Sequence, residues 1–378
     1  MSKALIIILL MVKAMSSATF SQQSPLPTSH KSWFDSQQKK VWFCLSWLLA
    51  MLIVASVVSL SFGPAGWDIR LSVAWFLPDT WHSISTLQLN IISEIRLPRL
   101  CLGLLIGAVL AQTGAATQAL CRNPLADPSV IGVSSGAAVM AVGMIALGPL
   151  LQATLGIKAE LMLPYAAFVG ALLATLLVYQ FAQSEQGVQV TSLILVGVAM
   201  NALGFALIGL LSFYADDSSL RLINYWTMGS LAGANWSSLF QALPLLLLSL
   251  VGLWSKRQQM SLLLLGESEA KYMGVNIKSL KNQIVIFVAI GVGAAVALTG
   301  LVGFLGLVIP HLSRILVGAN LKYMMPVSML LGALVLLASD WIARVAVVPA
   351  ELPIGIVTAI IGAPVFIWML RRQLMPHG

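Results

Sequence analysis

Residues 97–120 read LPRLCLGLLIGAVLAQTGAATQAL, an apolar run that contains a single charged residue, Arg99. A helix of about 20 apolar residues is long enough to cross the roughly 30 Å hydrocarbon core of a bilayer. Similar runs recur along the 378-residue chain, of which 59% is apolar and only 9% is charged. Ordinary soluble domains are about 45–50% apolar and 25% charged, so this composition excludes a soluble fold. The sequence predicts an all-α membrane protein.

Working outward from this run, the apolar pattern predicts about ten transmembrane helices. They are expected near 41–62, 97–120, 130–149, 161–182, 189–212, 236–255, 281–299, 302–318, 326–346 and 353–370. Gly300, Gly303 and Gly306 lie around the link between the seventh and eighth spans, where they could also interrupt one broken helix. An even number of spans puts both chain ends on the same side of the membrane.

The basic residues predict the orientation. When the loops are assigned alternately, 15 of the 21 Lys and Arg residues fall on the side of the termini and 6 on the opposite side. Because cytoplasmic loops carry an excess of basic residues, both termini are expected in the cytoplasm.

The chain divides into residues 1–40, expected to be a cytoplasmic tail, and residues 41–378, expected to be one ten-span domain. Residues 4–12 are apolar but too short to span, and small residues follow them, as in a signal peptide. Residues 21–40 are rich in Gln, Ser and Pro, which is typical of a disordered segment. An uncleaved tail and a misassigned start are the favoured interpretations of the first residues, with a signal-like segment as the alternative.

One loop on the side of the termini, residues 256–281, is both long and structured in its pattern. It contains GESEAKYMGV from Gly266 to Val275, with acidic residues at the start of a helix-forming run and Lys271 later. This charge order complements a helix dipole, so a short surface helix is expected. By composition alone, a helix on the lipid headgroups and a knob inserted into a soluble partner fit equally well.

Several chemistries are missing from the sequence. None of the 30 glycines is followed by lysine, so the phosphate-binding Gly-x-x-x-x-Gly-Lys loop of ATPases is absent. The three cysteines and four histidines form no pair at metal-ligand spacing, so we expect no metal and no bound cofactor in this chain. The chain is therefore expected to be a transport subunit and not an enzyme.

Acidic residues inside the apolar runs are scarce, which disfavours a proton-coupled secondary transporter. Asp340 has Arg344 one helical turn later, which favours a local ion pair near the outer interface. A membrane-bound enzyme is disfavoured because no cluster of His, Cys or acidic residues has acid–base or ligand spacing.

Five motifs follow one another along the chain: Arg96-Leu-Pro-Arg99, RNPLADPSVIGVSSG at 122–136, GESEAKYMGV at 266–275, GFLGLVIPH at 303–311 and ELPIGIVTAIIGAP at 351–364. In this order they resemble the BtuC-like permeases of bacterial iron-chelate and cobalamin ABC importers. The resemblance implies the ten-helix fold of a type II ABC importer permease in the bacterial inner membrane. It also implies a permease homodimer, two cytoplasmic ATPase subunits that bind ATP and Mg, and a periplasmic substrate-binding protein.

The resemblance implies roles for three groups of residues. Contact with the ATPase is implied for Gly266, Glu267, Ala270 and Gly274. Docking of the binding protein is implied for Arg96, Arg99 and Arg344, for which interfacial anchoring is the alternative. A place on the translocation pathway, with ordinary helix packing as the alternative, is implied for Ser134, Ser135, Met200, Asn201, Leu220 and Met228.

The cargo is the least specific part of the resemblance, since iron-siderophore, haem and cobalamin permeases share these motifs. Residues 125–128, 133–136 and 225–236 are slightly more similar to the haem and siderophore branch. We therefore expect an iron chelate, either haem or a ferric siderophore, to be moved into the cytoplasm. Cobalamin (vitamin B12) is the alternative.

Overall fold

The computed structural model describes residues 30–63, 66–67, 86–156, 158–184, 187–347 and 350–374. The expectations for the first 29 residues lie outside this described part. Each of the ten predicted spans contains a helix. The helices are α2 (His30–Ser61), α5 (Leu97–Cys121), α6 (Val133–Ala146), α8 (Ala159–Ala182), α9 (Val190–Tyr214), α11 (Trp236–Ser255), α14 (Ile277–Thr299), α15 (Leu305–Val317), α16 (Leu321–Val345) and α17 (Ile354–Leu374).

Not all of these helices are long enough to cross a membrane alone. Among the described residues, eight pass by length and composition, and a ninth span results if α6 and α7 (Gly148–Leu155), which meet at a 56° bend, are joined. The helix of the predicted eighth span, α15, has only 13 residues. At 1.5 Å per residue it is about 20 Å long, shorter than a bilayer core.

Helix α5 lies at the centre of the bundle and is the most buried of the spanning helices. It continues from α4 (Thr86–Ile91) through the π-helical turn η3 (Ile92–Arg96). Glycines let its neighbours approach closely. A Cβ at Gly107 would lie 2.5 Å from the Gly332 carbonyl oxygen, and one at Gly114 would lie 2.0 Å from that of Gly306. Glycines at these contacts therefore serve close helix packing, as expected for membrane helices.

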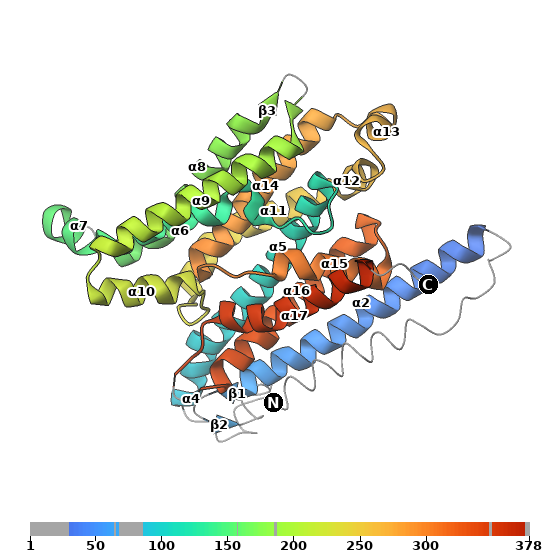
Figure 1. Cartoon of the computed structure of the whole chain (residues 1–378). Helices are drawn as coiled ribbons and strands as arrows, with labels where there is room; N and C mark the ends of the chain where they lie inside the picture. Colours follow the sequence, from blue (N-terminus) through green and yellow to red (C-terminus); the bar gives the residue numbers. More distant parts are fainter. Residues whose placement is uncertain are drawn as a thin grey trace.

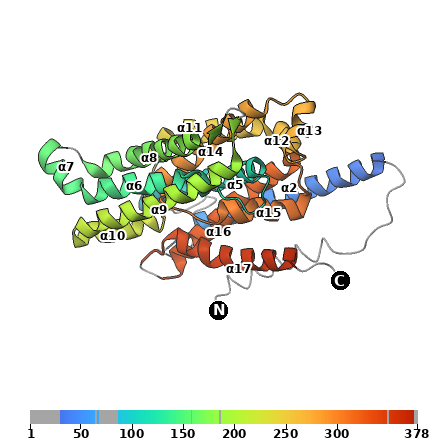
Figure 2. The ribbon, with the colours of Figure 1, turned by 45° about the horizontal axis from the view of Figure 1, so that its top comes forward.

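Short elements gather at the two ends of the bundle (Figures 1 and 2). We call one end the α13 end; it holds α12 (Arg257–Leu263), α13 (Glu267–Tyr272) and the hairpin of β3 (Gln183–Ser184) and β4 (Gly187–Val188). We call the other the α10 end; it holds α7, α10 (Asp217–Thr227) and the β1 (Phe62–Gly63) and β2 (Gly66–Trp67) pair. The remaining short helix, η4 (Pro128–Ile131), precedes α6.

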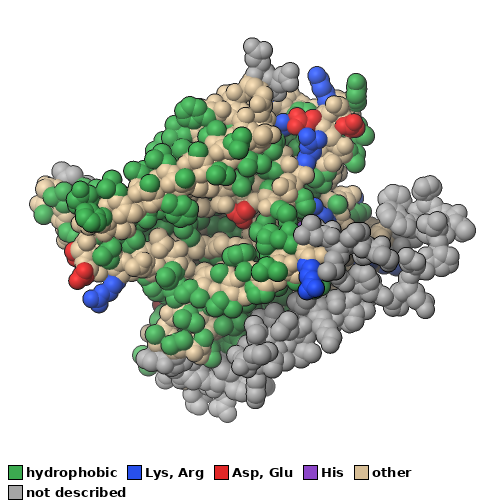
Figure 3. All heavy atoms as spheres, viewed as in Figure 1, with side chains coloured by type: hydrophobic (Ala, Val, Ile, Leu, Met, Phe, Trp, Pro, Cys, Tyr) green, Lys and Arg blue, Asp and Glu red, His purple; other side chains and the backbone are tan. Residues whose placement is uncertain are grey.

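The surface has the pattern of a membrane protein. In Figure 3, hydrophobic side chains cover the flanks of the helices, while most charged side chains are seen toward the two ends. This arrangement leaves apolar side chains where lipid replaces water and keeps charges near the aqueous phases.

Candidate functional site: the two ends of the bundle

The predicted surface helix exists as α13, a six-residue helix between two glycines. Gly266 has a φ of 143° and Gly274 a φ of 86°, backbone conformations that favour glycine at both turns. Tyr272 is 92% exposed and Met273, which directly follows the helix, is also exposed, so these two large side chains belong to the outer surface at the end of α13.

The structure corrects one part of the predicted contact surface. Ala270 is fully buried, with 0% exposure, and belongs to the main hydrophobic core. Its side chain therefore holds α13 against the bundle and is not available to a partner. Sequence reasoning missed Tyr272 and Met273, because a six-residue helix has too little periodicity to reveal which face is buried.

Helix α13 is attached by a group of charges that we call the α13 cluster: Arg122, Glu267 and Lys281. The Lys281 Nζ atom donates a hydrogen bond to Glu267 Oε2 at 2.8 Å and another to the Val188 carbonyl oxygen at 3.0 Å. An Arg122 guanidinium nitrogen lies 3.9 Å from Glu267 Oε1. One carboxylate thus connects α13 with the start of α14 and the end of α5.

A second group, the arginine cluster, lies at the α10 end and consists of Arg99, Asp340, Arg344 and Glu351. Arg99 donates from Nε to Asp340 Oδ1 at 2.9 Å. Its two terminal nitrogens bind the Glu351 oxygens at 3.1 and 2.9 Å, a bidentate pair. Arg344 Nε lies 3.1 Å from Asp340 Oδ2, which confirms the predicted ion pair between these two residues.

The three arginines predicted to dock a binding protein are buried in this chain. Arg96, Arg99 and Arg344 are between 4% and 8% exposed. Arg96 donates to the Leu60 carbonyl oxygen, and Arg344 donates to the Ser59 hydroxyl at 2.7 Å, so both also hold the end of α2. The docking role stays a prediction, and the structure adds partners within the chain that the sequence did not reveal.

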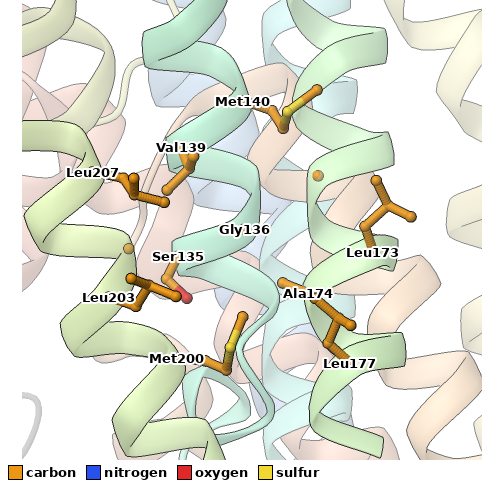
Figure 4. A pocket seen from close by; sticks show the side chains of 12 residues that line it. Ser135, Gly136, Val139, Met140, Leu173, Ala174, Leu177, Met200, Leu203 and Leu207 are labelled. Carbon is orange, nitrogen blue, oxygen red and sulfur yellow. The ribbon is translucent and has the colours of Figure 1, made fainter. Parts of the chain in front are cut away.

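The residues predicted for the translocation pathway fall into separate places. Ser135 and Met200 line a groove of about 150 Å³ between α6, α8 and α9, whose other lining side chains are apolar (Figure 4). Asn201 lies on α9 beside it and donates to the Ser129 carbonyl oxygen at 3.2 Å. Ser134, on α6, is half-buried and does not line the groove.

The other two pathway candidates belong to the α10 end. Leu220 is half-buried on α10, and Met228 follows the helix with its side chain exposed. The Met228 carbonyl oxygen accepts a hydrogen bond from the Gly355 amide at 3.0 Å, which places this segment beside the start of α17. The pathway assignment therefore stays a prediction for all six residues.

Helix α10 begins with a well-formed cap. The Asp216 carboxylate accepts hydrogen bonds from the Ser218 hydroxyl and the Ser219 amide. These bonds lower the pKa of Asp216 to about 2, so the carboxylate keeps its charge at every physiological pH. Asp127 caps η4 in the same way, but burial raises the pKa of its carboxyl group.

Among the described residues, no group of three or more His, Cys, Asp or Glu could hold a metal ion.

The apolar spans and the charged ends together define a multi-pass helical membrane protein. Residues 48–372 match the model of the FecCD transport family. Because this match covers most of the chain, the chain belongs to the FecCD transport family and is a permease of the ABC importer class. The predicted fold class and family resemblance are confirmed.

Individual relatives agree with this membership. The chain is 39% identical over 332 residues to the hemin transport system permease protein HmuU of Yersinia pestis, covering 87% of this chain and 95% of that one. It is 41% identical over 301 residues to the vitamin B12 import system permease protein BtuC of Vibrio cholerae, covering 79% and 87%. A solved inward-facing conformation of a metal-chelate type ABC transporter superposes with a TM-score of 0.75 at 34% identity, covering 87% of this chain and 98% of that chain.

Proposed function

We propose that this chain is the membrane subunit that moves an iron chelate, with haem as the first candidate, across the bacterial inner membrane into the cytoplasm. The observation that carries this proposal is the match to a hemin permease over almost the whole length of both chains. The vitamin B12 permease of Vibrio cholerae, at a similar identity over a shorter length, supports cobalamin as the second candidate.

The proposed assembly contains two copies of this chain, two ATPase subunits and a binding protein. Helices α9 and α17 are mostly exposed in the single chain although they are apolar, which leaves large faces for lipid or for a second copy. The ATPases belong at the α13 end, where the exposed helix projects. The binding protein belongs at the α10 end, and both termini lie in the cytoplasm.

In this assembly, ATP and Mg are bound by the ATPase subunits, because the sequence has no phosphate-binding loop of its own. The permease converts a push on α13 into a rearrangement of its spans. The groove between α6, α8 and α9, whose lining is almost entirely apolar, fits a path from which the cargo is also released.

The ATPase contact is tested by truncating the exposed face of α13. The double variant Tyr272→Ala with Met273→Ala is expected to abolish co-purification of the ATPase and ATP-dependent uptake, because exposed aromatic and Met side chains are the anchors of such interfaces. The matched control is Tyr214→Ala, another exposed tyrosine but at the far end of α9, which should leave ATPase capture unchanged. Normal ATPase capture by the double variant would contradict the assignment.

The cargo is tested by reconstituting the permease with its ATPase and binding protein in proteoliposomes. Haem, a ferric siderophore and cobalamin are each supplied in separate assays. ATP-dependent accumulation of haem supports the proposal, and accumulation of cobalamin alone would replace it by the second candidate. Accumulation by the isolated permease in a proton gradient would overturn the ABC mechanism altogether.

A further inference from the structure

We propose that Lys281 is a positioning residue that transmits movement of α13 to the β3–β4 hairpin and, through it, to α9. This inference rests on the proposed function, in which α13 receives the push of the ATPase. The observation behind it is a single buried ammonium group that binds two different elements at once.

Lys281 lies in the second turn of α14, and its side chain is only 5% exposed. A buried ammonium group is costly unless its charge is paired and its N–H groups have acceptors. Lysine carries three donors and no acceptor. Two of these donors have partners on separate elements, Glu267 on α13 and the Val188 carbonyl on β4, so neither element can shift alone without leaving a buried donor unsatisfied.

The hairpin is seated on α14 at a second position one turn earlier. Gly187 has a φ of 103°, and a Cβ added there would lie 3.3 Å from Lys278 Cγ. The adjoining Val188 is buried, and the Gln189 amide closes the hairpin by donating to the Ala182 carbonyl oxygen at 3.0 Å. Helix α9 begins at Val190, so a displacement of Val188 reaches α9 with almost no slack in the backbone.

The other partner of Glu267 is a much weaker attachment. Arg122 is 3.9 Å away and its side chain is 48% exposed, conditions under which an ion pair contributes little. Helix α5, which Arg122 terminates, is also the most buried of the spanning helices. Movement of α13 therefore passes through Lys281 to the hairpin and α9, while α5 stays in place. Met200, which lines the groove between α6, α8 and α9, lies on this same helix α9.

The test uses the complete reconstituted complex and the variant Lys281→Met, which keeps the length and the apolar stem but removes the three donors. The ATPase is expected to bind and to hydrolyse ATP, while cargo transported per ATP falls about tenfold. Lys278→Met is the matched control, since Lys278 is an exposed lysine one turn earlier on α14 and it touches the hairpin only through its aliphatic stem. It should keep the wild-type ratio.

A spectroscopic readout separates transmission from mere folding. Spin labels at Lys271 on α13 and at Gln189 beside the hairpin are each paired with a label on the rigid α5. In the otherwise wild-type chain both distances should change with nucleotide; in Lys281→Met only the distance to position 271 should change. A position 189 that moves as in the wild type would overturn the inference. Lys281→Arg, which keeps a charged donor, should restore both movements.

The charge-swapped variant Glu267→Lys with Lys281→Glu distinguishes the two contacts of Lys281. It can restore the ion pair to α13, but a carboxylate cannot donate to the Val188 carbonyl oxygen. Transport per ATP should therefore remain low, and full recovery would overturn the role of the hairpin contact. If the wild-type chain itself fails to capture the ATPase, the proposed function fails; if it couples normally and Lys281→Met does too, only this inference fails.

Discussion

The two charged clusters use the same chemistry at opposite ends of the bundle, but their surroundings differ. In the arginine cluster, Asp340 is 1% exposed and lies between two guanidinium groups. In the α13 cluster, Lys281 is buried but the Glu267 side chain is 39% exposed. Water and ions can therefore replace part of the α13 cluster, whereas they cannot reach the site of Asp340 in the arginine cluster.

This difference matches what each cluster connects. The arginine cluster joins the first turn of the central helix α5 to the end of α16 and to Glu351, in the segment just before α17. The α13 cluster joins one short helix and one short hairpin to the spans. We infer that the first cluster fixes the arrangement of the helices, while the second attaches parts that move during transport.

The largest expected effect comes from removing the central charge of the arginine cluster. Asp340→Asn keeps the side-chain shape but leaves Arg99 and Arg344 without their shared carboxylate. Removing one partner of a buried ion pair costs about 3–5 kcal/mol, so the free energy of unfolding in detergent should fall by this amount. The loss of stability is measured by thermal unfolding of the detergent-solubilised protein, with size-exclusion chromatography as the readout of the folded fraction.

Glu351→Gln is the matched control for this variant. Glu351 is 26% exposed and Arg99 keeps its bond to Asp340, so only about 1 kcal/mol should be lost. An Asp340→Asn protein as stable as the wild type would show that the arginine cluster does not hold the helices and would remove the contrast with the α13 cluster.

The arginine cluster also shows how far the sequence could predict the site. The pair of Asp340 and Arg344 follows from helical spacing, because residues four apart share a helix face. Arg99 and Glu351 are 252 residues apart, and no periodicity connects them. Their contact depends on how α5, α16 and the start of α17 meet in space, which a single sequence does not contain.

The same distinction applies to the fold. Apolar runs predicted where the helices lie, since hydrophobicity is a local property of the chain. The start of α15 was not predictable in this way: the predicted eighth span, 302–318, included residues 302–304, which belong to a non-helical segment before the helix. Phe304 has a φ of 68°, a left-handed conformation held by its surroundings and not signalled by its residue type.

The second largest expected change in stability concerns the packing of α9 near the α13 end. A Cβ at Gly197 would lie 1.6 Å from the Val130 carbonyl oxygen of η4, whereas a Cβ at Gly209, in the half of the helix toward the α10 end, would have no atom within 4 Å. Gly197→Ala should therefore cost about 1–3 kcal/mol by overpacking. Gly209→Ala should be neutral or slightly stabilising, since alanine favours helix.

Thermal unfolding of these two single variants, made in the same helix, gives a direct comparison. It also limits how α9 can respond to α13: a tight contact at Gly197 makes that point a pivot about which the hairpin end swings. Equal stability of the two variants would show that α9 is not held against η4, and a pivot there would have to be abandoned.

The smallest effect is expected from salt, and it probes both clusters in one molecule. Charge interactions between exposed groups are screened over about 10 Å at 0.1 M ionic strength and about 3 Å at 1 M, while buried pairs are screened much less. Raising the salt concentration should therefore loosen α13 through Glu267 and Arg122 but leave Asp340 and its arginines unaffected. Amide hydrogen exchange in detergent should rise about twofold over residues 267–272 and stay constant over residues 338–345.

Arg122→Gln should abolish part of the salt response of α13, because it removes the more exposed of the two ion pairs of Glu267. A salt response of equal size at both ends would mean that burial does not separate the clusters, and that the division between a fixed end and a moving end is wrong.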